Sequence, residues 1–186
     1  RLASWRQPLA SHVAALEGLR PQVERLQLGG AVGTRGDFGE EGPQIAAQIA
    51  KELTLIDGPV WHTDRSGVAA YAGCLSLITG SLGKIGQDVA LMAQQGIDDV
   101  TLTVGGGSSA MPHKSNPVLA ELLMTLARFN ATQLSGVHHA LVHEQERSGA
   151  AWMLEWMILP QMSVTTARAL TASQALCAQI RAVGKA

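Results

Sequence analysis

Residues 66–86 read SGVAAYAGCLSLITGSLGKIG, a weakly charged stretch whose spacing indicates the packing of the helices. No charged side chain lies between Ser66 and Gly83, and Gly80, Gly83 and Gly86 recur at every third position. On a helix this spacing puts the glycines on one face, where a second helix can approach closely. Each glycine weakens a helix by up to about 1 kcal/mol relative to alanine, so we expect dense packing there. The many small and polar side chains argue against a lipid-facing span, so the stretch predicts a helix buried in protein.

The overall composition is that of an aliphatic, weakly charged domain. The chain has 186 residues, and 14 Lys+Arg against 15 Asp+Glu give a net charge of −1, which offers no basis for binding nucleic acid or an anionic membrane. Hydrophobic residues make up 46% and charged residues 16%, so we expect faces buried against other subunits. Cys74 and Cys177 are interpreted as reduced core thiols of a cytoplasmic protein, since no signal-peptide pattern is visible.

Apolar periodicity predicts further long helices along the chain. We expect a kink or a short break at Pro8 and Pro21, a kink at Pro160 within the last helix, and a short extended piece over residues 100–104. Asn116, followed by proline, is a typical helix start. The expected helices span residues 2–26, 43–53, 64–95, 117–137 and 150–183. The sum is an all-α, long-helix bundle with almost no sheet.

The helical pattern stops over residues 96–116, and the most informative motif lies at their end. Residues 105–117 read GGGSSAMPHKSNP. Glycines let backbone N–H groups turn toward a ligand, Lys114 supplies a cation, and the helix that follows Asn116 attracts anions at its N-terminus. This combination suits a carboxylate whose α-carbon gains or loses a proton, because the charge developing on its oxygens must be stabilised. The alternative is a flexible linker followed by a capped helix.

Residues 107–117 of this motif resemble the signature of the fumarase/aspartase superfamily. The resemblance implies homotetramers of long helices, active sites shared between subunits, and addition or elimination next to a carboxylate through an aci-carboxylate intermediate. It implies Ser108 as the catalytic base on a mobile loop, with Ser109 as the alternative. It also implies that Met111, Lys114 and Asn116 contact the substrate. One departure from the family is a serine between Lys114 and Asn116, where arginine is frequent.

Other segments resemble one branch of this superfamily, the cycloisomerases that lactonise 3-carboxy-cis,cis-muconate. These segments are Trp5, Gly29–Thr34, Trp61–Arg65 and Glu144–Pro160. The resemblance implies that Trp5, Thr34 and Arg147 contact a small tricarboxylate substrate, and that no metal, nucleotide or redox cofactor is required. Adenylosuccinate lyase, which acts by β-elimination, is the nearest competing branch. A non-catalytic helical assembly domain is the third alternative.

Several of these residues also have a purely structural interpretation. Trp5 could belong to the core, Arg147 could pair with Glu144, and Arg65 could pair with Asp64. Asp64 is in addition one of two residues able to cap the helix that follows it.

His138, His139 and His143 could suggest a metal site, but the residues around them do not complete one. His139 and His143, expected one turn apart on a single helix, lack the acidic ligands that would complete such a site. A helix facing solvent or another subunit is the preferred interpretation.

The resemblance also implies that residues 1–186 are the central helical domain of a longer enzyme, without the family's N-terminal and C-terminal domains. The family's catalytic histidine precedes the position that Trp5 holds here. We therefore expect this chain alone to be inactive or nearly so, and its full-length parent to be an enzyme.

Overall fold

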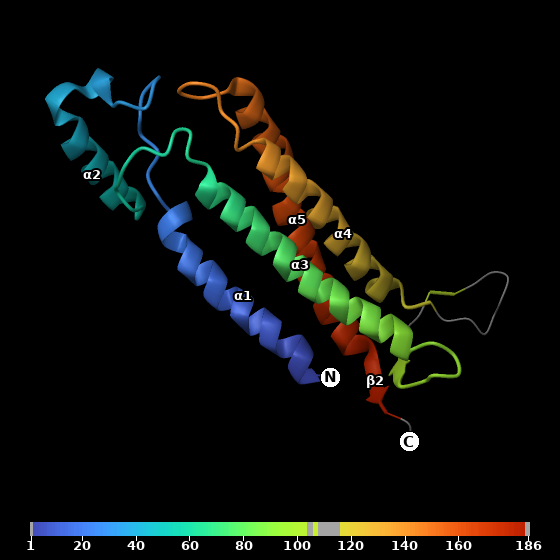
Figure 1. Ribbon diagram of the computed structural model, residues 1–186. Coiled ribbons are helices and arrows are strands. Elements are labelled where there is room, and N and C mark those ends of the chain that lie inside the picture. Colours follow the sequence, from blue (N-terminus) through green and yellow to red (C-terminus); the bar gives the residue numbers. More distant parts are fainter. Residues whose placement is uncertain (1, 104–105, 108–115, 185–186) are drawn as a thin grey trace. The chain divides into compact units, whose positions relative to one another are not determined.

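The computed structural model describes residues 2–103, 106–107 and 116–184 (Figure 1). Long helices dominate it, and the described part also holds one two-stranded sheet. The predicted all-α, long-helix class is confirmed. The elements in chain order are α1 (Leu2–Val23), η1 (Gly36–Glu41), α2 (Gly42–Leu53), α3 (Ser66–Met92), β1 (Val100–Leu102), α4 (Val118–His139), α5 (Gly149–Gln179) and β2 (Ile180–Val183).

The chain divides into two compact units. Unit 1 comprises residues 1–12, 75–133 and 161–186, and unit 2 comprises residues 13–74 and 134–160. Because α1, α3, α4 and α5 each cross a division point, all four helices contribute residues to both units.

The glycine row on α3 makes close helix contacts in unit 1, as its spacing predicts. A Cβ added at Gly83 would lie 2.6 Å from the Cβ of Ala127 on α4, and one at Gly86 would lie 2.5 Å from the carbonyl oxygen of Ala120. A Cβ at Gly80 would meet no described atom within 4 Å. Two of the three glycines therefore let α4 approach α3 to a distance that any side chain would prevent.

The same helix meets the length and composition criteria for a membrane span. Of its most apolar 18-residue window, 50% is buried within the chain. The close glycine contacts with α4 favour the interpretation of a helix covered by protein.

Helix α1 runs without a break through Pro8 and Pro21, where the sequence predicted an interruption. Pro21 lies close to the helix end, where little helix remains to be disrupted. Pro8 lies between two side chains that bond to α3 within unit 1: Trp5 donates to Asp88, and His12 is 2.8 Å from the Ser81 hydroxyl. These tertiary contacts offset the backbone bond that proline cannot make. Helix α5 continues through Pro160, as expected for the last helix, and the kink expected there stays a prediction.

The end of the chain differs from the sequence expectation. Helix α5 ends at Gln179, and residues 180–183 form β2 instead of a further helical turn. β2 pairs antiparallel with β1, with Val183 opposite Val100. Gly184 and Thr103 extend the pairing by donating backbone bonds to Asp99 and Gln179. The extended piece expected near residue 100 is confirmed as β1, and its pairing explains why the last residues leave the helix.

The two cysteines differ in exposure, and only Cys74 lies in the core as expected. Cys74 is buried, and burial raises the pKa of its thiol. Cys177 is exposed within α5, so its assignment to the core was wrong. Both thiols are free, as expected.

Candidate active site

The base of the signature segment is held by two backbone hydrogen bonds. Gly106 N–H donates to the Asn116 carbonyl at 2.9 Å, and Asn116 N–H donates to the Gly106 carbonyl at 3.0 Å. A Cβ at Gly106 would lie 2.6 Å from Cγ2 of Val118, so a larger residue at position 106 would require the Val118 side chain to move. Helix α4 begins two residues after Asn116, close to the expected start, and the Asn116 carbonyl accepts the Val118 N–H. Ser108, Ser109, Met111 and Lys114 lie outside the described residues.

Trp5 is a core residue of unit 1, with 8% of its surface exposed. Its indole Nε1–H donates to Oδ2 of Asp88 at 2.6 Å, and Lys84 binds the same carboxylate oxygen. Its N–H is therefore already used inside the protein. A contact between Trp5 and a substrate stays a prediction.

Thr34 lies on a sharply turned segment of unit 2. Gly30 and Gly33 have φ values of 68° and 80°, a backbone region that favours glycine. Arg35 fastens the segment, because its Nε donates to the Leu28 carbonyl at 2.8 Å and its Nη2 to the Gly58 carbonyl at 3.0 Å. Thr34 is exposed at the end of this turn, and its hydroxyl oxygen accepts the N–H of the second residue after it. A fixed backbone thus presents the Thr34 hydroxyl.

The turn packs against residues 60–62. A Cβ at Gly29 would lie 2.8 Å from Val60 and 3.3 Å from Nδ1 of His62. Gln27 clamps this segment: its Nε2 lies 2.8 Å from Nδ1 of His62, and its Oε1 accepts the Trp61 N–H at 3.1 Å. The other ring nitrogen of His62 and the indole nitrogen of Trp61 are buried without a hydrogen-bond partner among the described residues.

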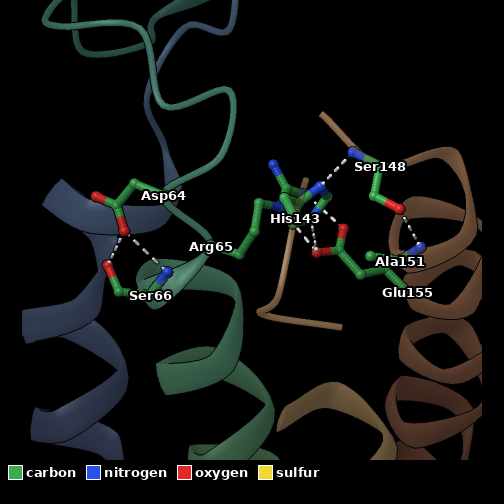
Figure 2. A network of polar contacts seen from close by, with 7 residues as sticks. All are labelled: Asp64, Arg65, Ser66, His143, Ser148, Ala151 and Glu155. Carbon is green, nitrogen blue, oxygen red and sulfur yellow. Dashed lines mark hydrogen bonds and ion pairs between the residues drawn. The ribbon is translucent and has the colours of Figure 1, made fainter. Parts of the chain in front are cut away.

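Arg65 forms a buried ion pair with Glu155 of α5 in unit 2, not the pair with Asp64 considered above (Figure 2). Its Nε donates to Oε1 of Glu155 at 2.8 Å and its Nη2 to Oε2 at 2.5 Å, while the side chains are only 11% and 4% exposed. Asp64 instead accepts the N–H and hydroxyl of Ser66 at the start of α3. These bonds lower the pKa of the Asp64 carboxyl, with the Ser66 hydroxyl as the largest cause.

His143 lies after the end of α4, so the expectation of one helix carrying it with His139 was wrong. Its side chain is 1% exposed. Nδ1 accepts the Ser148 N–H at 3.0 Å, and Nε2 lies 4.0 Å from Oε1 of Glu155 (Figure 2). The Ser148 hydroxyl lowers the pKa of the Glu144 carboxyl. The bond from the Ser148 N–H to His143 closes the loop from His143 to Ser148.

Arg147 lies on this closed loop and is exposed. Its guanidinium stacks on the Trp152 ring at 4.7 Å, and Trp152 meets Trp156 edge to face at 5.9 Å. No ion pair joins Arg147 to Glu144 among the described contacts, so the pairing slightly favoured from the sequence is not formed. The guanidinium edge remains accessible for a ligand carboxylate.

The described candidate residues fall in both units. Trp5 and Asn116 belong to unit 1, whereas Thr34 and Arg147 belong to unit 2. Within the described residues, no hydrogen bond or ion pair joins Trp5 to Asn116 or Thr34 to Arg147. The same part of the chain has no group of three or more His, Cys, Asp or Glu side chains arranged to hold a metal ion.

The sequence interpretation missed the partnership of Glu155 with Arg65 and His143. One signal could have found it. Between Arg147 and Arg168, Glu155 is the single charged residue in an otherwise apolar and neutral run. A lone carboxylate on a long apolar helix needs a buried partner.

The chain is similar to known proteins over most of its length. The chain matches the family model described as "Lyase" over residues 1–132. It is 40% identical over 174 residues to the 3-carboxy-cis,cis-muconate cycloisomerase of Pseudomonas aeruginosa, a match that covers 91% of this chain and 38% of the relative. It is 31% identical over 168 residues to the N-acetyl-S-(2-succino)cysteine lyase of Dickeya dadantii, covering 88% of this chain and 37% of the relative.

A solved structure gives a similar result. The 3-carboxy-cis,cis-muconate lactonizing enzyme from Pseudomonas putida matches with a TM-score of 0.89 and 34% identity, covering 97% of this chain and 40% of that chain. This chain spans about two fifths of the length of the curated relatives it matches. Because the family model covers most of the sequence and the fold agrees, the chain belongs to the lyase family of the fumarase/aspartase superfamily.

Proposed function

We propose that residues 1–186 are the central helical domain of a longer enzyme that converts 3-carboxy-cis,cis-muconate into carboxymuconolactone. The observation that carries this proposal is the 40% identity with a named cycloisomerase across 91% of the chain. The paired base of the signature segment, Gly106 with Asn116, supports it, because it fixes both ends of the segment that would carry the chemistry.

The proposed reaction is an intramolecular addition. One carboxylate oxygen adds across a double bond, and a proton taken up from solvent is delivered to the carbon α to a second carboxylate, so the free acids of substrate and product are isomers. The aci-carboxylate intermediate carries additional charge on its oxygens, which fixed cations and N–H groups stabilise. We assign the proton transfer to Ser108, with Ser109 as the alternative. A serine needs activation for this role, which nearby N–H groups or Lys114 would supply.

The remaining candidates are assigned to substrate binding. The substrate has three carboxylates, and Lys114, Asn116 and Arg147 offer two cations and an amide to them. Thr34 would donate its hydroxyl from the rigid turn. Met111 and Trp5 would contact the carbon skeleton.

We also propose that the enzyme is a cytoplasmic homotetramer whose active sites are shared between subunits. The support is an apolar surface on α5 of unit 2, where Met153, Trp156 and Met157 are 63%, 68% and 64% exposed. Exposed Trp and Met side chains beside Arg147 have the composition of an interface core. Light scattering on the intact enzyme should give four subunits, and Trp156→Glu should lower this number while the helical circular dichroism is retained.

A second candidate is β-elimination from a succinyl compound. The 31% identity with N-acetyl-S-(2-succino)cysteine lyase favours it, and it includes the adenylosuccinate lyase-like alternative. Both reactions use the same stabilised carboxylate intermediate, so the substrate decides between them.

Assays of the intact enzyme with 3-carboxy-cis,cis-muconate and with adenylosuccinate and N-acetyl-S-(2-succino)cysteine test the proposal, each followed by the loss of substrate absorbance or by product analysis. We expect turnover of the muconate alone, and a loss of about 100-fold or more in kcat for Ser108→Ala. Turnover of only a succinyl compound would replace the proposal with the second candidate. Absence of any turnover would support the non-catalytic alternative, and normal turnover by residues 1–186 alone would contradict the assignment to a central domain.

A further inference from the structure

The closed loop from His143 to Ser148, which carries Arg147, is held in unit 2 by buried residues that the proposed reaction does not use. Glu155 stands at the centre of this assembly, with both carboxylate oxygens bonded to Arg65. His143 lies between this ion pair and the backbone of Ser148 (Figure 2). The side chains of Arg65, Glu155 and His143 and the residue Ser148 are largely or fully buried, so solvent competes little for their hydrogen bonds.

The hydrogen bonds define the state of His143. Because Nδ1 accepts the Ser148 N–H, the proton of the neutral ring is on Nε2. Nε2 has no hydrogen-bond partner among the described residues and lies 4.0 Å from Oε1 of Glu155. The carboxylate therefore favours this tautomer electrostatically and keeps Nδ1 free to accept the backbone N–H.

Ser148 transmits this arrangement to the start of α5. Its N–H bonds to His143, and its hydroxyl oxygen lies 3.5 Å from the backbone nitrogen of Ala151. Arg147 is the residue directly before Ser148, so the path of its backbone is fixed by these bonds.

We propose that His143, supported by the Arg65–Glu155 ion pair, is a positioning residue that holds the closed loop so that Arg147 presents its guanidinium to a substrate carboxylate. The assignment of Arg147 to a carboxylate rests on the proposed function. His143 itself does not contact the reacting atoms. Its effect passes through Ser148 and the loop backbone to Arg147.

Two histidine substitutions separate positioning from simple loss of stability. His143→Leu removes the acceptor for the Ser148 N–H, whereas the Oδ1 of His143→Asn lies where Nδ1 was and can still accept it. In the intact enzyme we expect His143→Leu to raise KM for 3-carboxy-cis,cis-muconate about tenfold with little change in kcat, since a misplaced Arg147 weakens a charge-assisted bond. His143→Asn should restore most of the affinity. His139→Leu, the same change at an exposed neighbour, is the matched control.

The double variant tests whether the effect passes through Arg147. In an Arg147→Ala background, His143→Leu should add little further change to KM, because the group it positions is already gone. Additive effects of the two substitutions would overturn the proposal.

Hydrogen exchange provides a readout that does not depend on the reaction. The Ser148 amide should exchange faster in His143→Leu and Glu155→Gln than in the wild type, and remain protected in His139→Leu. Unchanged protection of Ser148 in His143→Leu would overturn the proposal. If the wild-type enzyme does not turn over the muconate, the proposed function fails, and this exchange measurement alone decides whether His143 holds the loop.

Discussion

Two contacts position helix α3, one in unit 1 and one next to its start in unit 2, and they depend on opposite features of the sequence. In unit 1, Gly83 and Gly86 contact α4 because they have no side chain. In unit 2, Arg65, directly before the helix, reaches Glu155 with a long charged side chain. The glycine contact is disrupted when a side chain is added, and the ion pair is disrupted when one of its two partners is removed. The difference shows that α3 is held by close packing alone at Gly83 and Gly86, whereas an ion pair next to its start adds to its packing in unit 2.

Removing one charge from the buried pair is expected to have the largest effect on stability. Glu155→Leu leaves the Arg65 guanidinium buried without its partner, which costs about 3–5 kcal/mol in the free energy of unfolding. Urea unfolding followed by far-ultraviolet circular dichroism measures this loss. Replacing both partners, as in Arg65→Met with Glu155→Leu, should recover most of it, since no unpaired charge remains. A single variant as stable as the double variant would show that solvent reaches the pair.

Adding one methyl group to the packed glycines should have the next largest effect. A Cβ at Gly86 would lie 2.5 Å from the Ala120 carbonyl oxygen, so α3 or α4 must shift. We expect Gly86→Ala to lower the free energy of unfolding by about 1–3 kcal/mol, in the range found for overpacked cores. The same urea unfolding experiment measures it.

Gly80 provides the matched control, because it has the same helical spacing and is exposed. A Cβ there meets no described atom within 4 Å, so Gly80→Ala should raise stability by up to about 1 kcal/mol through helix propensity alone. Equal losses at Gly80 and Gly86 would contradict the assignment of the contact to close packing with α4.

The sequence could predict the packed contact and much of the fold, because packing leaves a periodic pattern. The three-residue glycine spacing, the helix start after Asn116 and the break near Gly149 all follow from local rules, and the structure has each of them. The absence of a break at Pro8 and the strand at residues 180–183 have one cause. Hydrogen bonds to distant segments, such as Trp5 to Asp88 and Gly184 to Asp99, decide the local structure there.

The charged contact could not be predicted in the same way. Arg65 and Glu155 are 90 positions apart, and no spacing rule selects Glu155 over the adjacent Asp64. The contacts that hold the candidate site could not be predicted from the sequence for the same reason. Thr34 and Arg147 were found through a family resemblance, whereas the residues that hold them, such as Arg35 and His143, are recognisable only from their contacts.

The smallest expected effect concerns Asp64, which caps the start of α3 and directly precedes Arg65 in the chain. The Ser66 hydroxyl and N–H lower the pKa of Asp64 below its ordinary value of 3.8, so the carboxylate stabilises the fold above that pH. This contribution is lost as the pH falls through the lowered pKa of the folded state. Since Asp64 is exposed, we expect Asp64→Ala to cost about 0.5–1 kcal/mol at neutral pH, the lower part of the range for helix caps.

Unfolding measured at neutral pH and again below the lowered pKa checks the sign of this effect. The difference between wild type and Asp64→Ala should shrink in acid, because the protonated carboxyl is a weaker acceptor for the Ser66 N–H. Asp64→Asn is the control, since its amide oxygen can accept the same bond without titrating, and its advantage over alanine should not change with pH. A wild-type advantage that persists in acid would assign the cap to hydrogen-bond geometry alone, and the negative charge of Asp64 would then add nothing to the stability of α3.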